Sequence, residues 1–319
     1  MKLALCLPPL AGYDQAIEKG LANFDLVNLK QLNEQERLQA LKDADALFCH
    51  WLGDELTDQE RGLLGDKKFV YTLSAGVETI RFHSLGKGTV LYSNVGAWAS
   101  SMAESCLAMI YAHLRRFNDQ KRVMKEGQYP RTWPLRTVGD VKCLVWGWGG
   151  IGKACAELLW KLGGHVSAVS RRKPDDSRLE AAYSMDEFDE AIKNCDILIM
   201  AVPANKTSVG MIDAKRLALM PKNGALINLA RARLINRDDL YAHLKANPDF
   251  GAALDVWWNE DSAWDKDPLV ELDNVIPSAH NSEMSDTIWL DALHTAMERI
   301  NALARGEEIP GRVNYDDYC

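Results

Sequence analysis

Three ionisable side chains follow predicted β-strands at the points where those strands end. Arg231 follows the run Ile-Asn-Leu-Ala, Glu260 lies just past Asp-Val-Trp, and His280 follows Val-Ile-Pro-Ser-Ala. The carboxyl ends of parallel strands open into a crevice in α/β sheets. Arginine can fork onto an oxo-acid, histidine can move a proton, and glutamate can hold an imidazolium. Singly, these residues are more often a surface cation, a solvated turn residue and a core histidine, but together they predict acid–base chemistry.

A glycine-rich turn joins a predicted strand, Lys142–Trp146, to a predicted helix over residues 151–162. Its three glycines have the G-x-G-x-x-G spacing, which allows a tight turn, close approach of backbone to a pyrophosphate, and close helix–strand packing. A second predicted strand, His165–Ser170, completes a βαβ unit. We therefore predict a dinucleotide site rather than an unrelated glycine-rich turn. Its predicted contacts are Gly147, Gly149, Gly150, Ile151 and Gly152.

The end of the second strand of that unit indicates which dinucleotide binds. A site for NAD needs a carboxylate for the ribose 2′-hydroxyl about 20 residues past the first glycine. Here the chain has Ser170, Arg171, Arg172 and Lys173 instead. Guanidinium groups bind a 2′-phosphate through charge-assisted hydrogen bonds, whereas a carboxylate would repel it. This segment predicts NADP(H) as the cofactor, with a solvated basic turn as the alternative.

Composition is typical of an enzyme with two domains in the cytoplasm. The chain has 319 residues, of which 47% are hydrophobic, enough for two cores. Its formal net charge of −8 argues against nucleic acid or an anionic membrane as a partner. We expect no membrane span and no metal site. Seven cysteines without a C-x-x-C pair predict reduced thiols, mostly in the core, with Cys319 as an exposed exception.

The elements that position these residues belong to an α/β fold with two doubly wound parallel-sheet domains. Before the glycine-rich turn, strands are predicted at residues 3–7, 24–29, 46–51, 69–73 and 90–94. After it, further strands are predicted at residues 195–202, 225–230, 252–257 and 275–280.

Two predicted helices connect the domains. Ser101 and Glu104 have the spacing of a capping box that opens a helix through about Arg115, and a last helix covers about residues 286–304. With hinges near Gly96 and Ser285, residues 1–96 and 286–319 form the predicted substrate domain. Residues 97–285 form the predicted NADP-binding domain.

Several segments together resemble the D-isomer-specific 2-hydroxyacid dehydrogenase family, over nearly the whole chain. Residues 228–231 resemble its N-T-A-R-G segment, residues 253–256 with Glu260 its A-L-D-V-F-x-x-E-P segment, and residues 277–280 its T-P-H segment. Ala232, Glu78 and Asn281 depart from the usual pattern, and these departures concern the substrate more than the reaction. The resemblance implies a Rossmann nucleotide-binding domain and a flavodoxin-like substrate domain.

The resemblance also implies roles for individual residues. Arg231 binds and polarises the substrate, Glu260 is the partner of the histidine, and His280 is the general acid or base. The backbone of Ala75, Gly76 and Val77 holds the substrate carboxylate. Further implied cofactor contacts are Pro203, Ala230 and Asp255, the last with the nicotinamide carboxamide.

Within this family the chain is most similar to NADPH-dependent glyoxylate/hydroxypyruvate reductases, which implies reduction of a small 2-oxo acid to the D-2-hydroxy acid. Trp51, Trp98 and Trp133 are candidates to line a small pocket, although tryptophan is more often core or cover. One alternative is a dehydrogenase for a larger or phosphorylated D-2-hydroxy acid. Another is a non-catalytic dinucleotide-sensing protein. The family resemblance also implies a homodimer.

Overall fold

The computed structural model describes residues 1–258, 260 and 267–318, which divide into two units. Unit 1 comprises Met1–Trp98 and Ser285–Cys319, and unit 2 comprises Ala99–Met284. The predicted hinges near Gly96 and Ser285 lie within two residues of these boundaries. Cys319 lies outside the described residues.

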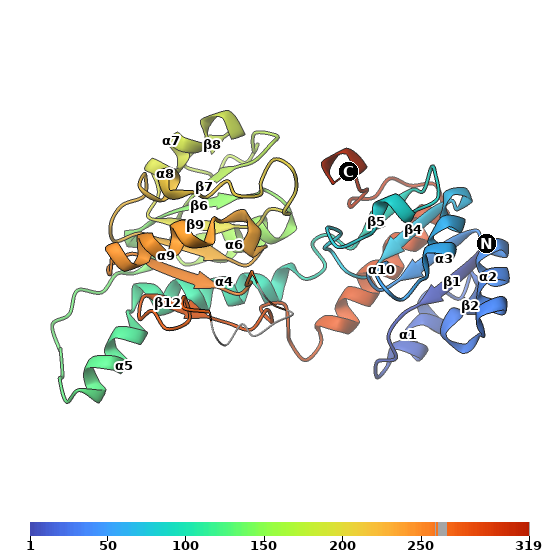
Figure 1. The fold of residues 1–319 in the computed structure, drawn as a ribbon, viewed down its shortest axis with the longest axis horizontal. Helices are drawn as coiled ribbons and strands as arrows, with labels where there is room; N and C mark the ends of the chain where they lie inside the picture. Colours follow the sequence, from blue (N-terminus) through green and yellow to red (C-terminus); the bar gives the residue numbers. More distant parts are fainter. Residues whose placement is uncertain (259, 261–266, 319) are drawn as a thin grey trace. The chain divides into compact units, whose positions relative to one another are not determined.

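Unit 1 contains a parallel five-stranded sheet of order β2-β1-β3-β4-β5, which is the flavodoxin-like order (Figure 1). The predicted flavodoxin-like sheet is confirmed. Its strands are β1 (Lys2–Cys6), β2 (Asp25–Asn28), β3 (Ala46–Cys49), β4 (Phe69–Thr72) and β5 (Leu91–Ser93). Its helices are α1 (Tyr13–Gly20), α2 (Glu34–Asp43), α3 (Asp58–Gly62) and α10 (Ile288–Ala304).

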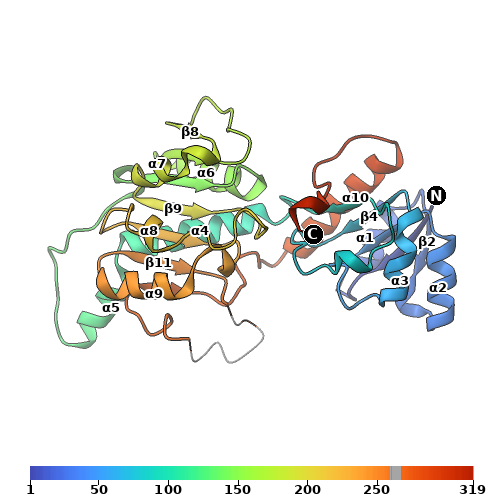
Figure 2. The same cartoon turned by 45° about the horizontal axis from the view of Figure 1, so that its top comes forward.

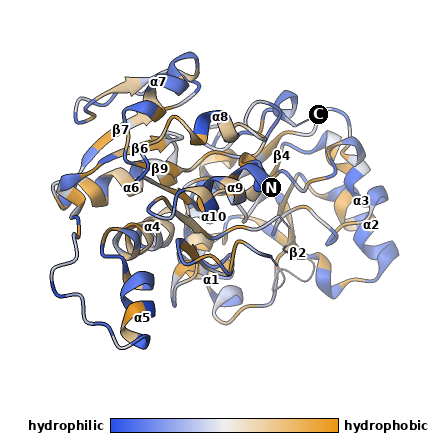
Figure 3. Ribbon diagram, turned by 60° about the vertical axis from the view of Figure 1, so that its left-hand side comes forward, coloured by the Kyte–Doolittle hydropathy of each residue, from blue (hydrophilic) through white to orange (hydrophobic). Residues whose placement is uncertain are grey.

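Hydrophobic strands and amphipathic helices explain how unit 1 folds. All four residues of β3 and all four of β4 are buried, as expected for strands covered on both faces. Helix α2 begins at a capping box in which Asn33 and Glu36 bond each other's backbone N–H groups. Figure 3 shows this helix largely blue, consistent with burial of Ala40 and Leu41 on its inner side.

Unit 2 contains a parallel seven-stranded sheet of order β12-β11-β10-β9-β6-β7-β8. Numbered from its own first strand, this is the Rossmann order 3-2-1-4-5-6 with a seventh strand added, so that prediction is confirmed. The strands are β6 (Lys142–Trp146), β7 (His165–Val169), β8 (Ala182–Tyr183), β9 (Ile197–Met200), β10 (Ala225–Asn228), β11 (Gly251–Leu254) and β12 (Val275–Pro277).

Two hydrophobic cores cover the two faces of this sheet. One core joins the strands to α4 (Ala99–Leu114) and α6 (Gly150–Lys161). The other joins them to α7 (Phe188–Lys193), α8 (Ala214–Leu217) and α9 (Arg237–Ala246). Figures 1 and 2 both show α5 (Phe117–Lys125) and the chain after it standing away from the sheet.

The predicted capping box at Ser101 is wrong. Helix α4 begins at Ala99, so Ser101 already lies inside the helix. Its hydroxyl instead donates to the carbonyl oxygens of Ser282 and Met284, at 3.2 and 3.1 Å. Ser105, one turn later, donates to Ser282 at 2.8 Å. This face of α4 therefore holds the segment that follows His280.

Candidate active site

The glycine-rich turn between β6 and α6 has the backbone that the sequence predicts. Gly147 has a φ of 110°, and a Cβ there would lie 2.4 Å from the carbonyl oxygen of Ala201. A Cβ on Gly152 would lie 1.9 Å from the carbonyl oxygen of Gly147. A Cβ on Gly149, at the start of α6, would meet nothing within 4 Å. The first and third glycines are thus required by packing, and the second faces open space.

This geometry fits a dinucleotide. The open side at Gly149 lies at the start of a helix of 12 residues, where backbone N–H groups including those of Gly150 and Ile151 lack helical partners. A pyrophosphate is the group that such a turn accepts. The turn that contains Pro203 follows β9 and lies beside the first glycine, because the close contacts of Gly147 are with Ala201 and Val202.

The basic segment after β7 is exposed at Arg171, Arg172 and Lys173. The hydroxyl of Ser170 donates to the carbonyl oxygen of Arg172, which curls the chain into a turn. Lys173 forms an ion pair with Glu187 at 3.1 Å. The lysine charge is therefore partly compensated within the chain.

Arg231 occupies a turn that is built by a buried asparagine at the end of β10. Asn228 is fully buried, and its side chain accepts the N–H of Ala230 at 3.1 Å and donates to the carbonyl oxygen of Arg231 at 2.9 Å. The half-buried Arg231 also donates from Nη1 to the carbonyl oxygen of Ala230 at 2.6 Å. Sequence reasoning missed Asn228, although a polar residue that ends a fully apolar strand is a usable signal.

His280 and Glu260 form a hydrogen-bonded pair, as predicted. The Nδ1 atom of His280 lies 2.9 Å from Oε2 of Glu260, while Oε1 of Glu260 accepts the N–H of Trp257 at 2.9 Å. The side chains are 42% and 36% exposed. Because Nδ1 bonds the carboxylate, Nε2 is the nitrogen that can exchange a proton with another molecule.

The surroundings of the pair favour the charged forms of both His280 and Glu260. The hydrogen bond with Glu260 raises the pKa of His280, against partial burial and the positive charge of Arg231. Burial alone would raise the pKa of Glu260, but hydrogen bonds from His280 and from the backbone of Trp257 together lower it. The positive charge of Arg231 lowers the pKa of both groups, so its guanidinium lies within electrostatic range of the pair.

The backbone at His280 is unusual and is anchored by Asp255. The predicted strand to residue 280 is too long, since β12 ends at Pro277 and His280 has a left-handed φ of 51°. Asp255 is fully buried, and its carboxylate accepts the hydroxyl of Ser278 at 2.5 Å and the N–H groups of Asn281 and Ser282 at 3.1 and 3.2 Å. These bonds fix both sides of His280.

In unit 1, the loop after β4 carries the predicted carboxylate-binding residues Ala75, Gly76 and Val77. The N–H of Ser74 donates to the carbonyl oxygen of His50 at 2.8 Å, which ties this loop to the end of β3. The N–H of Val77 donates to Oε2 of Glu78 at 2.9 Å. This amide is therefore already oriented toward a carboxylate, which here belongs to the chain itself.

The three candidate tryptophans have different surroundings. Trp51 is 45% exposed, and its backbone N–H donates to Oε1 of Glu55 at 3.0 Å. Trp98 is buried and donates from Nε1 to the carbonyl oxygen of Leu73 at 3.4 Å. Trp133 lies in unit 2 under the guanidinium of Arg116, at 4.8 Å. Of these three, Trp51 has the largest exposed surface to offer a ligand.

Within the described ranges, no group of three or more His, Cys, Asp or Glu side chains gathers as a metal site would need. In the same part of the chain, no helix is long and apolar enough to cross a membrane. The six described cysteines are free and buried.

Comparison with curated proteins gives relatives of similar length. The chain is 26% identical over 294 residues to a glyoxylate reductase from Thermofilum pendens, covering 88% of this chain and 85% of that protein. It is also 26% identical over 291 residues to a D-lactate dehydrogenase from Staphylococcus aureus, covering 83% of this chain and 84% of that protein. These two relatives have different named substrates.

Solved structures have the same fold. A D-isomer specific 2-hydroxyacid dehydrogenase from Xanthobacter autotrophicus Py2, solved with NADPH and MES, superposes with a TM-score of 0.81 at 20% identity and covers 98% of both chains. The family model described as D-isomer specific 2-hydroxyacid dehydrogenase, NAD binding domain, matches residues 107–282, more than half of the chain. With the glycine-rich turn and the histidine–glutamate pair inside that match, the chain belongs to the D-isomer-specific 2-hydroxyacid dehydrogenase family.

Proposed function

We propose that this protein reduces a small 2-oxo acid of the glyoxylate or hydroxypyruvate type to the D-2-hydroxy acid with NADPH. The observation that carries this proposal is the 2.9 Å contact between His280 and Glu260 beside Arg231. A carbonyl that becomes a hydroxyl must gain a proton, and a histidine whose pKa is raised by a carboxylate is protonated over a wider pH range.

The side chains of this site have different proposed roles. His280 donates a proton from Nε2 to the carbonyl oxygen of the substrate, and Glu260 stabilises the imidazolium before that transfer. The guanidinium of Arg231 binds the carboxylate and carbonyl oxygens and stabilises the charge that develops on the latter. NADPH supplies the hydride when it is bound.

The dinucleotide is held by the glycine-rich turn in this proposal. The N–H groups of residues 149–152 bind its pyrophosphate, with the help of the helix dipole of α6. Pro203 and Ala230 contact the remainder of the cofactor. The predicted contact of Asp255 with the nicotinamide carboxamide stays a prediction, since the described hydrogen bonds of that carboxylate run to the loop of His280.

The substrate carboxylate is bound by the backbone of Ala75, Gly76 and Val77, and Trp51 contributes an apolar wall. Oriented amides accept a carboxylate without a cationic side chain. The likeness to the Thermofilum pendens glyoxylate reductase supports a small acid, at 26% identity. Pyruvate remains a candidate because of the Staphylococcus aureus relative.

NADP(H) is proposed over NAD(H) because Ser170, Arg171 and Arg172 stand where an NAD site needs a carboxylate. Replacing Arg171 and Arg172 with alanine is expected to weaken NADPH binding about tenfold or more and to leave NADH binding within about twofold. The matched control is Lys173→Ala, since that lysine is paired with Glu187. Equal effects on both cofactors would contradict the assignment.

A cytoplasmic homodimer is proposed as the assembled form. The arm formed by α5 and the chain after it exposes Phe117, Met124 and Tyr129, at 57%, 55% and 74%. Exposed apolar side chains on a projecting segment are typical of an interface. Free, buried thiols support a reducing compartment. Light scattering at micromolar concentration tests the dimer, and a single monomeric species would refute it.

The deciding experiment follows NADPH and NADH oxidation separately with glyoxylate, hydroxypyruvate, pyruvate and a bulkier 2-oxo acid. We expect NADPH oxidation with the small acids, and a loss of about 100-fold or more in turnover for His280→Ala. Near-normal turnover of that variant would remove His280 from its role. Tight NADPH binding without turnover of any acid would favour a dinucleotide-sensing protein.

A further inference from the structure

His50 lies beside the loop that is proposed to bind the substrate carboxylate. It directly follows β3, and its carbonyl oxygen accepts the N–H of Ser74 at 2.8 Å. Leu73 is likewise bonded to the carbonyl oxygen of Cys49, at 2.9 Å. Strands β3 and β4 are neighbours, and the backbones of neighbouring parallel strands lie about 4.8 Å apart. The residue after β3 and the loop after β4 are therefore separated by about the length of a three-carbon acid.

The imidazole of His50 is flanked by aromatic rings. It is stacked with Trp51 at a centroid distance of 6.1 Å and an interplanar angle of 29°, and lies 5.6 Å from the ring of Trp289. Within residues 1–258, 260 and 267–318, neither of its ring nitrogens has a hydrogen-bond partner. Burial, and secondarily the charge of Lys30, lower the pKa of His50. At neutral pH the ring therefore presents one donor and one acceptor and carries no charge.

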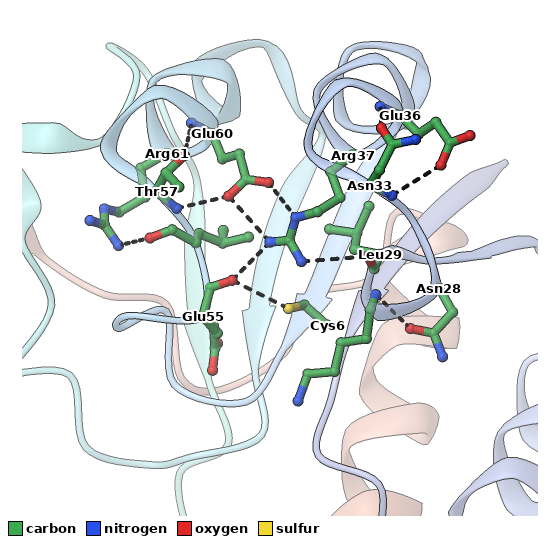
Figure 4. A network of polar contacts seen from close by, with 12 residues as sticks. Cys6, Asn28, Leu29, Asn33, Glu36, Arg37, Glu55, Thr57, Glu60 and Arg61 are labelled. Atoms are coloured by element: carbon green, nitrogen blue, oxygen red, sulfur yellow. Dashed lines mark hydrogen bonds and ion pairs between the residues drawn. The ribbon is translucent and has the colours of Figure 1, made fainter.

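The backbone around His50 and Trp51 is held in a costly conformation. The buried Leu52 has a φ of 59°, a left-handed value that is rare for a branched aliphatic residue. Oε1 of Glu55 accepts the N–H groups of Trp51 and Leu52, at 3.0 and 2.8 Å. Figure 4 shows the segment of Glu55 fastened in turn by Arg37 and Cys6, which both donate to its carbonyl oxygen. Strained backbone conformations persist only where the surrounding structure enforces them, and they are concentrated at functional sites.

Gly53 leaves room for the indole of Trp51. A Cβ on Gly53 would lie 2.9 Å from Cε2 and Nε1 of Trp51, so the ring covers this backbone only because the residue is glycine. The indole stacks with the ring of His50, and Trp51 is 45% exposed. The two side chains form a half-polar, half-apolar surface at the end of β3.

We propose that His50 is a specificity-determining residue that hydrogen-bonds a hydroxyl group on C3 of the 2-oxo acid, with Trp51 against the carbon that bears it. The substrate class is then a 3-hydroxy-2-oxo acid with an uncharged end, such as hydroxypyruvate. A phosphorylated acid is disfavoured because an uncharged imidazole does not compensate a phosphate. This inference rests on the proposed function.

The test compares hydroxypyruvate with pyruvate, which differ only in this hydroxyl. We expect the wild-type enzyme to prefer hydroxypyruvate in kcat/KM. His50→Phe is expected to lower kcat/KM for hydroxypyruvate about tenfold and for pyruvate less than about twofold. His50→Gln, which keeps a donor and an acceptor, is expected to recover part of the loss. His83→Phe, an exposed histidine of the same unit, is the matched control.

The outcomes separate this inference from the function on which it rests. Selective loss with hydroxypyruvate and partial rescue by glutamine support the role of His50. Equal losses with both acids, or a wild-type enzyme without preference for hydroxypyruvate, overturn that role while the reductase assignment stands. A wild-type enzyme that turns over no 2-oxo acid overturns the proposed function, and the inference with it.

Discussion

Replacing Glu260 by glutamine isolates the effect of its charge on His280. Glutamine keeps the size of the side chain and one oxygen acceptor for Nδ1 of His280, so the ring retains its orientation. It removes the negative charge that favours the imidazolium. We therefore expect the pKa of His280 to fall in Glu260→Gln.

The expected size of this fall follows from the exposure of the pair. Hydrogen bonds to charged groups contribute about 1.5–3 kcal/mol in buried sites, and exposed ion pairs about 0.2–1 kcal/mol. With side chains 42% and 36% exposed, the pair lies between these cases. Solvent screening reduces the free energy of its interaction to about 1 kcal/mol. Because this stabilisation is lost in Glu260→Gln, the pKa of His280 falls and the midpoint of the pH profile moves to lower pH.

The assay is the pH dependence of kcat/KM for reduction of the best 2-oxo acid, which reports groups of the free enzyme. Reduction uses protonated His280, so activity falls as the pH rises through the pKa of that residue. A lower pKa makes Glu260→Gln lose activity at lower pH than the wild type. At a pH below both midpoints, His280 is protonated in the wild type and in Glu260→Gln. A difference in kcat/KM that remains there measures the orientation of the His280 ring rather than its charge.

A second pair in unit 2 provides the control. His165 and Glu180 also form an Nδ1–carboxylate hydrogen bond, but lie at the start of β7 and the segment paired with it. Glu180→Gln is expected to leave the profile unchanged. A midpoint for Glu260→Gln that is unmoved or moves upward would refute the assignment of His280 as the proton donor.

Three further substitutions test other parts of the site. Gly147→Ala is expected to destabilise the protein by about 1–3 kcal/mol and to weaken dinucleotide binding, because φ is 110° and the new Cβ would clash with Ala201; thermal unfolding and cofactor titration measure this. Glu78→Ala is expected to lower KM for the 2-oxo acid about threefold by freeing the N–H of Val77, and an unchanged KM in steady-state assays would contradict this. Asp255→Asn is expected to lower kcat more than NADPH affinity; the opposite result would favour a direct contact with the cofactor.

The sequence predicts the fold well because its signals are local. Strand β6 and helix α6 are predicted within one residue at each end, since an apolar run, three glycines and an amphipathic helix follow one another directly. Strand β8, with two half-buried residues, is not predicted because it lacks a hydrophobic pattern. Several strands were predicted too long, as at His280, because apolar composition continues past the last ladder hydrogen bond.

The candidate site is predicted less completely than the fold. Residue type and position after a strand identify Arg231, Glu260 and His280, but these signals do not reveal what orients them. Asn228 acts through bonds to backbone groups close in the chain, whereas Asp255 binds the hydroxyl of Ser278 and two backbone N–H groups that lie 23 or more residues away. The bonds of Asp255 depend on the register between β11 and β12, which becomes known only when the sheet is assembled.

Two loops, one in each unit, share a device that explains how a non-glycine residue is kept in a left-handed conformation. In unit 1, Glu55 accepts two consecutive N–H groups at Leu52; in unit 2, Asp255 accepts two consecutive N–H groups just after His280. A carboxylate suits this task because it only accepts, and its two oxygens offer several directions to adjacent donors. In unit 1 the carboxylate comes from the same loop, whereas in unit 2 it comes from the residue that follows the neighbouring strand β11. In each loop a carboxylate, and not a glycine, holds the left-handed conformation. A residue with a side chain can therefore occupy that position, which is His280 in unit 2 and the buried Leu52, next to Trp51, in unit 1.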